Sequence, residues 1–194
     1  MFRSAIALIR KPMPKRGRRS WKAASLAAIL CGLALAGCYA SSGLLLDVGE
    51  TVQPLIGGLY IRDGDPTDRF QLTQTAGGGY RLERFNANGT VGETHQILIT
   101  PMALDDGKAA FAVAEQTDDG YAYAVALIDT GRVQLATPDC ADPLDLNLAV
   151  DQGGEADDDT GMTPACKFRN RVALLSALAA FAGQADFGAP YQRH

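Results

Sequence analysis

The chain has 194 residues, which suits one domain preceded by a targeting sequence, and its apolar content is that of an ordinary globular protein. Eight of its eighteen Lys and Arg residues lie between Arg3 and Lys22, and no acidic residue precedes Asp47. From residue 38 onward ten basic residues stand against twenty-two acidic ones, a balance of −12. This balance argues against binding to nucleic acid, or to anionic lipid headgroups through a basic face.

A signal peptide is predicted at the start of the chain. A basic stretch, residues 10–22, precedes the apolar run Ala23–Gly37. As a helix this run would be about 22 Å long, shorter than the roughly 30 Å hydrocarbon core, so a signal-peptide core fits better than a membrane span. Translation from Met1 gives a long basic region and translation from Met13 one of normal length, so both starts stay open.

The apolar run ends in Leu35-Ala36-Gly37-Cys38. This quartet resembles the lipobox of bacterial lipoproteins, in which Leu, two small residues and Cys stand in this order. The resemblance implies cleavage between Gly37 and Cys38, a diacylglyceryl group on the Cys38 sulfur and a further acyl chain, such as palmitate, on its amino group. Two or three acyl chains anchor a protein firmly in a bilayer, whereas one binds marginally. The alternatives are an uncleaved transmembrane anchor and an ordinary signal peptide.

The residue after the cysteine is Tyr39. In lipoproteins of two-membrane bacteria an Asp at this site implies retention in the inner membrane, so Tyr here implies the outer membrane, with the domain in the periplasm. Arg18-Arg19 also resembles a twin-arginine export signal. The expected organisation is a signal peptide over 1–37, a lipidated N-terminus and tether over 38–57, and one periplasmic domain over 58–194.

The domain is expected to be mainly β (α+β). Short β-prone runs are cut by turn signals, which predicts an antiparallel meander closed as a sandwich or a barrel, with one C-terminal helix packed on it. Seven strands are predicted: Gly58–Arg62, Arg69–Thr75, Tyr80–Phe85, Glu93–Thr100 (ended by Pro101), Ala110–Glu115, Tyr121–Asp129 and Arg132–Thr137.

The sixth predicted strand has two unlike faces. Tyr121, Tyr123, Val125 and Leu127 alternate with three alanines at positions 122, 124 and 126. We expect the helix to pack on the alanine face. The alternative is that the alanines line an internal cavity.

A helix is predicted over residues 170–183. Asn170 suits its N-cap, Gly183 its C-terminus, and Leu174, Leu178 and Phe181 form an apolar stripe. The last residues, 187–194, are expected to form a tail, pinned by Phe187 and Tyr191.

The cysteines divide by position. Cys31 lies in the signal-peptide core, whereas Cys140 and Cys166 form an even pair in an exported domain and are expected to form a disulfide. Metal and cofactor sites are not expected, because His95 and His194 lack zinc-ligand spacing. The acidic loop after Gly153 offers a weak calcium candidate at Asp157 and Asp159, without an EF-hand register.

No catalytic residue is assigned. Ser176 has no glycine-flanked elbow, and a Cys–His95 pair conflicts with the disulfide. Most acidic residues are expected to be solvated in turns: Asp63, Asp65, Asp68, Asp105, Asp106, Asp118 and Asp119.

The expected function is that of a membrane-anchored envelope lipoprotein, a non-catalytic binding or structural module. Its partners would be the lipid bilayer, through acylated Cys38, and an envelope protein or small ligand, but no nucleic acid. One alternative is a carboxylate-dependent cell-wall hydrolase, which needs two converging acids. The other is a β-barrel that binds a hydrophobic ligand.

Overall fold

The computed structural model describes residues 39–104, 109–157 and 165–194. The predicted signal peptide, its cleavage site at Gly37, Cys38 and Asp159 therefore lie outside the described residues. Within the described residues, no helix has the length and apolar character needed to cross a membrane.

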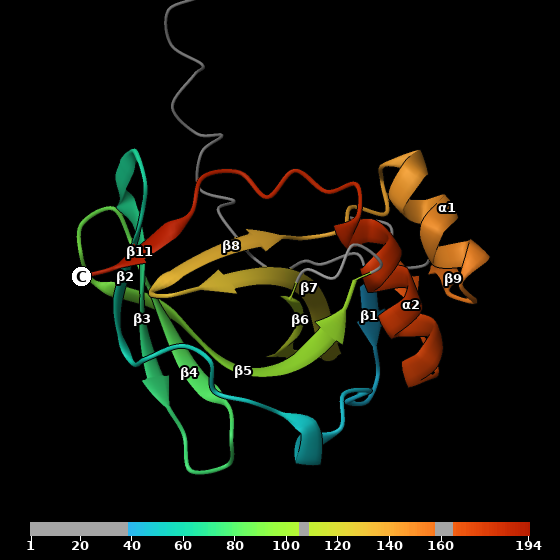
Figure 1. Ribbon diagram of the computed structural model, residues 1–194, viewed down its shortest axis with the longest axis horizontal. Coiled ribbons are helices and arrows are strands. Elements are labelled where there is room, and N and C mark those ends of the chain that lie inside the picture. Colours follow the sequence, from blue (N-terminus) through green and yellow to red (C-terminus); the bar gives the residue numbers. More distant parts are fainter. Residues whose placement is uncertain (1–38, 105–108, 158–164) are drawn as a thin grey trace, which may run out of the picture. The chain divides into compact units, whose positions relative to one another are not determined.

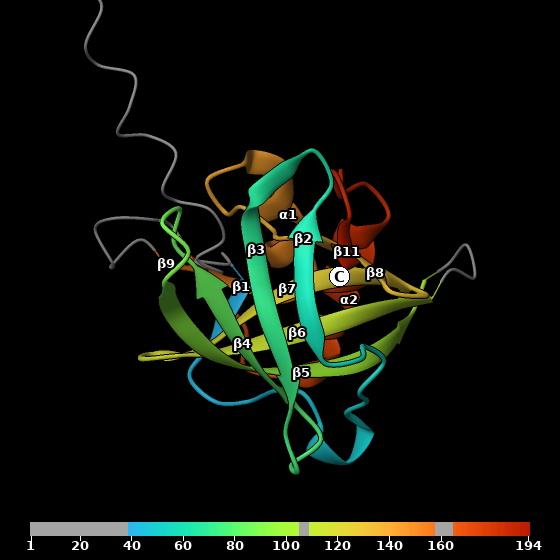
Figure 2. The same ribbon diagram turned by 90° about the vertical axis from the view of Figure 1, so that its left-hand side faces the viewer.

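Eight antiparallel strands close into a barrel, so the mainly β prediction is confirmed in its barrel form. Going around the barrel the order is β6-β5-β4-β3-β2-β11-β8-β7, and β7 pairs with β6 to close it (Figure 1). In Figure 2 the strands β2 and β3 face the viewer, in front of β5, β6 and β7. The bounds are β2 Gly58–Arg62, β3 Asp65–Gln74, β4 Tyr80–Phe85, β5 Val91–Ala103, β6 Ala109–Thr117, β7 Gly120–Asp129, β8 Arg132–Ala136 and β11 Tyr191–Arg193.

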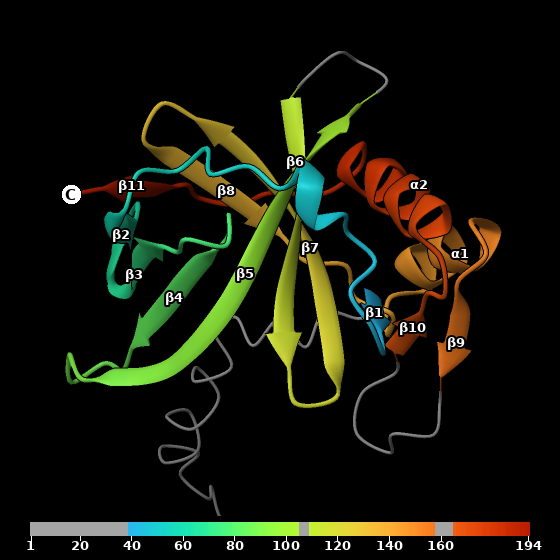
Figure 3. The ribbon, with the colours of Figure 1, turned by 90° about the horizontal axis from the view of Figure 1, so that it is seen from below.

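Three short strands extend the sheet from β7. They are β1 (Tyr39–Ser41), which pairs with β7, then β10 (Ala165–Lys167) and β9 (Glu155–Asp157). Beside them lie helices α1 (Pro143–Asp151) and α2 (Arg171–Ala182), at the side of the barrel far from β2 and β11 (Figure 3). A 3-10 turn, η1 (Val48–Glu50), follows β1 in the chain.

The described apolar residues form two clusters, one on each side of the barrel wall. The inner core fills the barrel and includes Tyr60, Phe70, Leu72, Ile97 and Val113. The outer core lies between the wall and the helices and includes Tyr39, Tyr123, Leu174, Leu178 and Phe181.

The expected packing of β7 is wrong. Ala122, Ala124 and Ala126 belong to the inner core, and the bulky Tyr123 and Val125 face α2 in the outer core. The physical reason is the narrow interior of an eight-stranded barrel, where large residues on some strands require small ones opposite. Ala126 lines an internal cavity, as the alternative prediction for the alanine face states.

The predicted helix is confirmed as α2. The Asn170 side chain accepts a hydrogen bond from the Ala173 amide at 2.8 Å, and the stripe Leu174, Leu178 and Phe181 is buried. Helix α2 contacts the outer face of β5, β6 and β7.

Strand β5 continues past Pro101 to Ala103, so the prediction that Pro101 ends it is wrong. Beyond Ile97 none of the described strands pairs with the edge of β5 that faces away from β6, while the pairing with β6 continues from Ile97 to Ala103. A residue without an N–H is tolerated at such an edge.

The described part of the 38–57 segment is not a free tether. Tyr39 is fully buried, its ring lies 5.1 Å from that of Phe168, and its hydroxyl donates to the Asp145 carbonyl at 2.9 Å. Strand β1 approaches β7 closely at Gly120, which has φ +142° and where a Cβ would collide with the Ser41 carbonyl. The expectation of a tether is corrected because Tyr39 fills space between the helices and the sheet.

The C-terminal tail is also more than a pinned loop. Its residues Tyr191–Arg193 form β11, which bridges β2 and β8 and completes the barrel. Helix α1 was not predicted, although Asp142 at its N-cap and Pro143 at its first position are the residues that favour a helix start.

Candidate functional site

Seven polar residues gather on the inner side of the barrel wall and at its rim, toward one end. The strand register assigns inward positions, because directly paired residues share a face. His95 is paired with inward Leu82, Glu115 with Ile97, and Arg84 with Phe70. We call the set the polar cluster: Arg62, Asp68, Arg84, Glu93, His95, Glu115 and Tyr191.

His95 connects two carboxylates within the polar cluster. Its Nδ1 lies 2.5 Å from Glu115 Oε1, and its Nε2 lies 3.3 Å from Glu93 Oε2. Glu115 is 3% exposed, whereas the Glu93 side chain is 63% exposed. The imidazole therefore joins a buried carboxylate to one in contact with solvent, an arrangement that can pass a proton between them.

Burial dominates the electrostatics of this site. It raises the pKa of Glu115, against the opposing effects of His95 and Arg84. Burial also lowers the pKa of Arg84, opposed first by Glu115 and then by Tyr191, Glu93 and Asp68. Arg84 therefore lies among acidic groups from several strands.

A second group within the polar cluster centres on Asp68. Its Oδ2 accepts a hydrogen bond from the Tyr191 hydroxyl at 2.8 Å and lies 3.2 Å from Arg62 Nη1. Burial, followed by the hydrogen bond to Asp68, raises the pKa of Tyr191. The Tyr191 ring packs on Phe70 at 5.1 Å. These contacts connect β11 to β2 and β3 at the closure of the barrel.

Beside the polar cluster the barrel contains a cavity of about 40 Å³. Eleven of the twelve residues around it are apolar, and they include Leu82, Ile97, Ile99 and Ala126. The twelfth is Arg84. The surface of this cavity is almost wholly apolar, so it is suited to the apolar part of a small molecule.

The segment between η1 and β2 closes the barrel near the first residue of β4. Leu55 is buried in the inner core, and its amide donates to the Tyr80 hydroxyl at 2.8 Å. The Leu55 carbonyl accepts hydrogen bonds from Tyr80 at 2.9 Å and from Gln74 at 3.1 Å. Tyr80 starts β4 and Arg84 stands near its end, so the closed end and the polar cluster lie at opposite ends of this strand.

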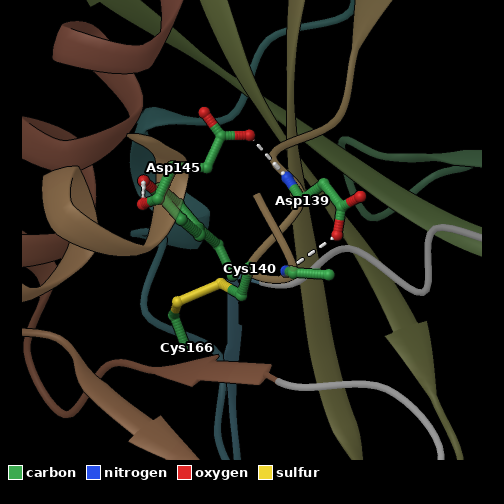
Figure 4. The surroundings of a disulfide bond; sticks show 6 residues. Asp139, Cys140, Asp145 and Cys166 are labelled. Carbon is green, nitrogen blue, oxygen red and sulfur yellow. Dashed lines mark hydrogen bonds between the residues drawn. A yellow bond between two sulfur atoms is a disulfide. The ribbon is translucent and has the colours of Figure 1, made fainter. Parts of the chain in front are cut away.

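The predicted disulfide between Cys140 and Cys166 is present, with a Cα–Cα distance of 6.1 Å. It joins the segment after β8 to β10, beneath α1 (Figure 4). The same segment is held by Asp139, whose amide donates to Asp145 Oδ2 at 2.7 Å and whose Oδ1 accepts from the Ala141 amide at 2.9 Å. The disulfide belongs to the outer core and does not touch the cavity.

The remaining candidates from the sequence lie apart from the polar cluster. Asp157 forms an ion pair with Lys167 in β10, and within the described ranges no group of three or more His, Cys, Asp or Glu residues has metal-binding geometry. Ser176 is exposed on α2, and His194 is exposed beyond β11.

Acidic residues were expected in solvated turns, and Asp63, Asp118 and Asp119 are exposed as predicted. Asp68 is different, because it lies in β3 and pairs with Tyr191 and Arg62. The prediction that Asp68 is a solvated turn acid is therefore wrong. Asp105 and Asp106 lie outside the described residues.

Sequence reasoning missed the polar cluster, although a signal for it exists. Arg84 continues the alternation of Tyr80 and Leu82, and Glu115 that of Phe111 and Val113. A charged residue at a position where the alternation predicts an inward apolar residue indicates a charged group in the barrel interior.

Comparisons with protein-family models, with curated proteins and with solved structures found no match. The class of this protein is therefore defined by its fold, a closed eight-stranded antiparallel barrel with a helix packed on it. Its function is inferred from the barrel interior and not from a relative.

Proposed function

We propose that the protein is an anchored binding module of the bacterial cell envelope whose barrel takes up the apolar part of a small ligand. The observation that carries the proposal is the apolar cavity of about 40 Å³ inside the closed barrel. Well-packed cores hold few voids larger than a water molecule, and a void weakens the fold because its lining loses packing contacts. A ligand would offset that loss.

The size of the cavity limits the ligand. At about 10–15 Å³ for each water-sized position, 40 Å³ offers about three positions, enough for the end of a short alkyl chain. Pockets for drug-sized ligands measure about 300–1,000 Å³. The proposed ligand is therefore small, or enters with only its tip.

The proposed anchor is acylated Cys38. Its support is the order of basic region, apolar run and Leu35-Ala36-Gly37-Cys38 in the sequence. The disulfide between Cys140 and Cys166 agrees with an oxidising compartment. Because Tyr39 is buried in β1, an anchor at Cys38 would hold the barrel at the outer-membrane surface without a spacer.

A Cys38→Ser variant tests the anchor. It should lose membrane attachment and accumulate as a longer precursor in cell fractionation, whereas Cys31→Ser, in the apolar run, should fractionate as the wild type does. Cys38→Ser protein that is processed and fractionates like wild type would remove the anchor from the proposal.

Binding to the cavity is tested with butanol as a neutral probe, on the full chain in lipid nanodiscs. Methyl NMR signals of Leu82, Ile97 and Ile99 should shift saturably. Ala126→Leu fills the cavity and should abolish the shifts, whereas Ala103→Leu, the same change at an exposed position on β5, should leave them unchanged. Equal shifts in both variants, or none in the wild type, would refute the proposed binding.

A carboxylate-dependent hydrolase is the second candidate, because Glu93 and Glu115 converge on His95. The cavity beside them is much smaller than a glycan-binding cleft, so we favour binding. Turnover of purified cell-wall glycan by the full chain, lost in Glu115→Gln, would reverse this preference.

A further inference from the structure

Leu55 differs in its setting from the other residues that line the cavity. Eleven of the twelve lie in the strands of the barrel wall, whereas Leu55 lies in the irregular segment that connects η1 to β2 (Figure 1). We call residues 53–57 of this segment the strap. Leu55 is 5% exposed, but its neighbours Pro54 and Ile56 are exposed, Ile56 to 63%. A single residue of the strap therefore separates the cavity from solvent.

The backbone of the strap is held by side chains. None of the described strands pairs with residues 53–57. The Leu55 amide donates to the Tyr80 hydroxyl at 2.8 Å, and the Leu55 carbonyl accepts from the same hydroxyl at 2.9 Å. The Ile56 carbonyl accepts from the Tyr60 hydroxyl at 2.9 Å. The strap can therefore open without separating any pair of strands.

The two ends of the strap are built differently. Just before it, the Val52 amide donates to the Ile99 carbonyl at 2.8 Å, which fixes the chain to β5. At the other end Gly57 and Gly58 connect the strap to β2. Glycine tolerates a wider range of φ and ψ than other residues, so these two can take up the backbone change of a hinge.

Other routes into the cavity are more costly. A route through the wall separates paired strands and leaves their backbone groups without partners. A route at the polar cluster passes Glu115, which is buried against His95, and the hydrogen bond between Tyr191 and Asp68. An apolar ligand cannot replace these polar contacts as it passes, so it would leave buried polar groups unsatisfied.

We infer that the strap is the gate of the cavity, through which the ligand enters and leaves when Leu55 moves outward. This inference rests on the proposed binding function and adds the route of the ligand. Tyr80 is a positioning residue in this gate, because it binds both backbone groups of Leu55 and does not itself line the cavity. Its hydroxyl should therefore control the rate of exchange and not the affinity.

The experiment measures butanol exchange on the full chain in lipid nanodiscs, by relaxation dispersion of the Ile97 and Ile99 methyl signals. Tyr80→Phe removes the hydroxyl and both of its bonds to Leu55, so the association and dissociation rates should each rise about tenfold. The affinity should stay within about twofold of the wild type, since the closed strap is weakened equally in the free and the bound protein. Tyr191→Phe, the same change at the polar cluster, should leave both rates unchanged.

Hydrogen exchange of the wild type without ligand gives a second measurement. The Leu55 amide should exchange through local opening, at a rate that does not depend on urea below the unfolding transition. The amides of β6, which is paired with β5 and β7, should instead exchange faster as urea increases.

Two results would overturn the inference. One is butanol binding whose association rate is unchanged in Tyr80→Phe, or is raised only in Tyr191→Phe, which leaves the proposed binding function standing. The other is a Leu55 amide that exchanges only together with the amides of β6, through global unfolding. Absence of butanol binding by the wild type would refute the proposed function itself, and the gate with it.

Discussion

The cores on the two sides of the barrel wall differ in their packing and in their charge. The outer core is closed by aromatic and aliphatic side chains, by the disulfide between Cys140 and Cys166, and by the buried ring of Tyr39. The inner core retains a cavity and is bordered by buried or half-buried charges. The outer core is therefore covalently cross-linked and closely packed, whereas the inner core contains a void and adjoins charged groups.

The largest effect is expected from Tyr39, in the outer core. Tyr39→Ala should lower the free energy of unfolding by about 3–5 kcal/mol, because a fully buried ring is lost between Phe168 and Phe181. Tyr39→Phe keeps the ring and loses the hydrogen bond to the Asp145 carbonyl, at a cost of about 1 kcal/mol. Urea unfolding measures both. A loss near zero in Tyr39→Ala would mean that residues 39–41 are a free tether.

The disulfide is expected to contribute nearly as much. Replacing Cys140 and Cys166 together by Ala should lower the free energy of unfolding by about 3.5 kcal/mol, since the bond closes a loop with a sequence separation of 26. Unfolding of the reduced wild-type chain is the control and should show the same loss. A loss below about 1 kcal/mol would indicate that the inner core, and not the disulfide, provides most of the stability.

A matched pair of substitutions compares the two cores directly. Ala177→Leu adds volume in the outer core, where Ala177 is fully buried on α2, and should cost about 1–3 kcal/mol. Ala126→Leu places the same side chain into the cavity and should change the free energy of unfolding by less than about 1 kcal/mol. Thermal unfolding followed by circular dichroism ranks them. Equal costs would mean that the interior has no usable space.

The smallest effect concerns the pH dependence of stability. Burial raises the pKa of Glu115 above its ordinary value of 4.5, so the folded protein holds this proton more tightly than the unfolded chain. The stabilisation is complete below pH 4.5 and is lost as the pH rises through the raised pKa. Glu115→Gln should make the unfolding free energy flatter with pH in that range.

Urea unfolding at a series of pH values checks this prediction, with Asp119→Asn in an exposed turn as the control. The control should follow the wild-type curve. A Glu115→Gln curve parallel to that of the wild type would show that the carboxyl group titrates alike in the folded and the unfolded chain.

Local signals in the sequence were sufficient for much of the fold. The bounds of β2 and β4, and the helix cap at Asn170, depend on turn residues and alternation close in the chain, and they match the structure. Long-range packing decided the rest. The residues near Ala124 in the sequence do not indicate that its side chain faces the barrel interior, because this orientation follows from closure of the barrel. Tyr39 and Tyr191 lie in strands because they pair with residues that are distant in the sequence.

The candidate site was harder to predict, because its residues come from six strands, the last of them at the C-terminal end of the described chain. His95, the one residue of the polar cluster weighed as a catalytic partner, was considered with cysteine, whereas its contacts are Glu93 and Glu115. Arg84 was not selected as a candidate site residue from the sequence, because single arginines are common in strands. Its significance depends on the apolar residues that other strands place around it.

Closure of the barrel by β11 determines when the barrel can form during synthesis of the chain. Because β11 pairs with both β2 and β8, the wall stays open until residues 191–193 are available. Pairings between such distant segments form slowly. A chain synthesised from its N-terminal end therefore cannot complete the barrel until residues 191–193 have been made.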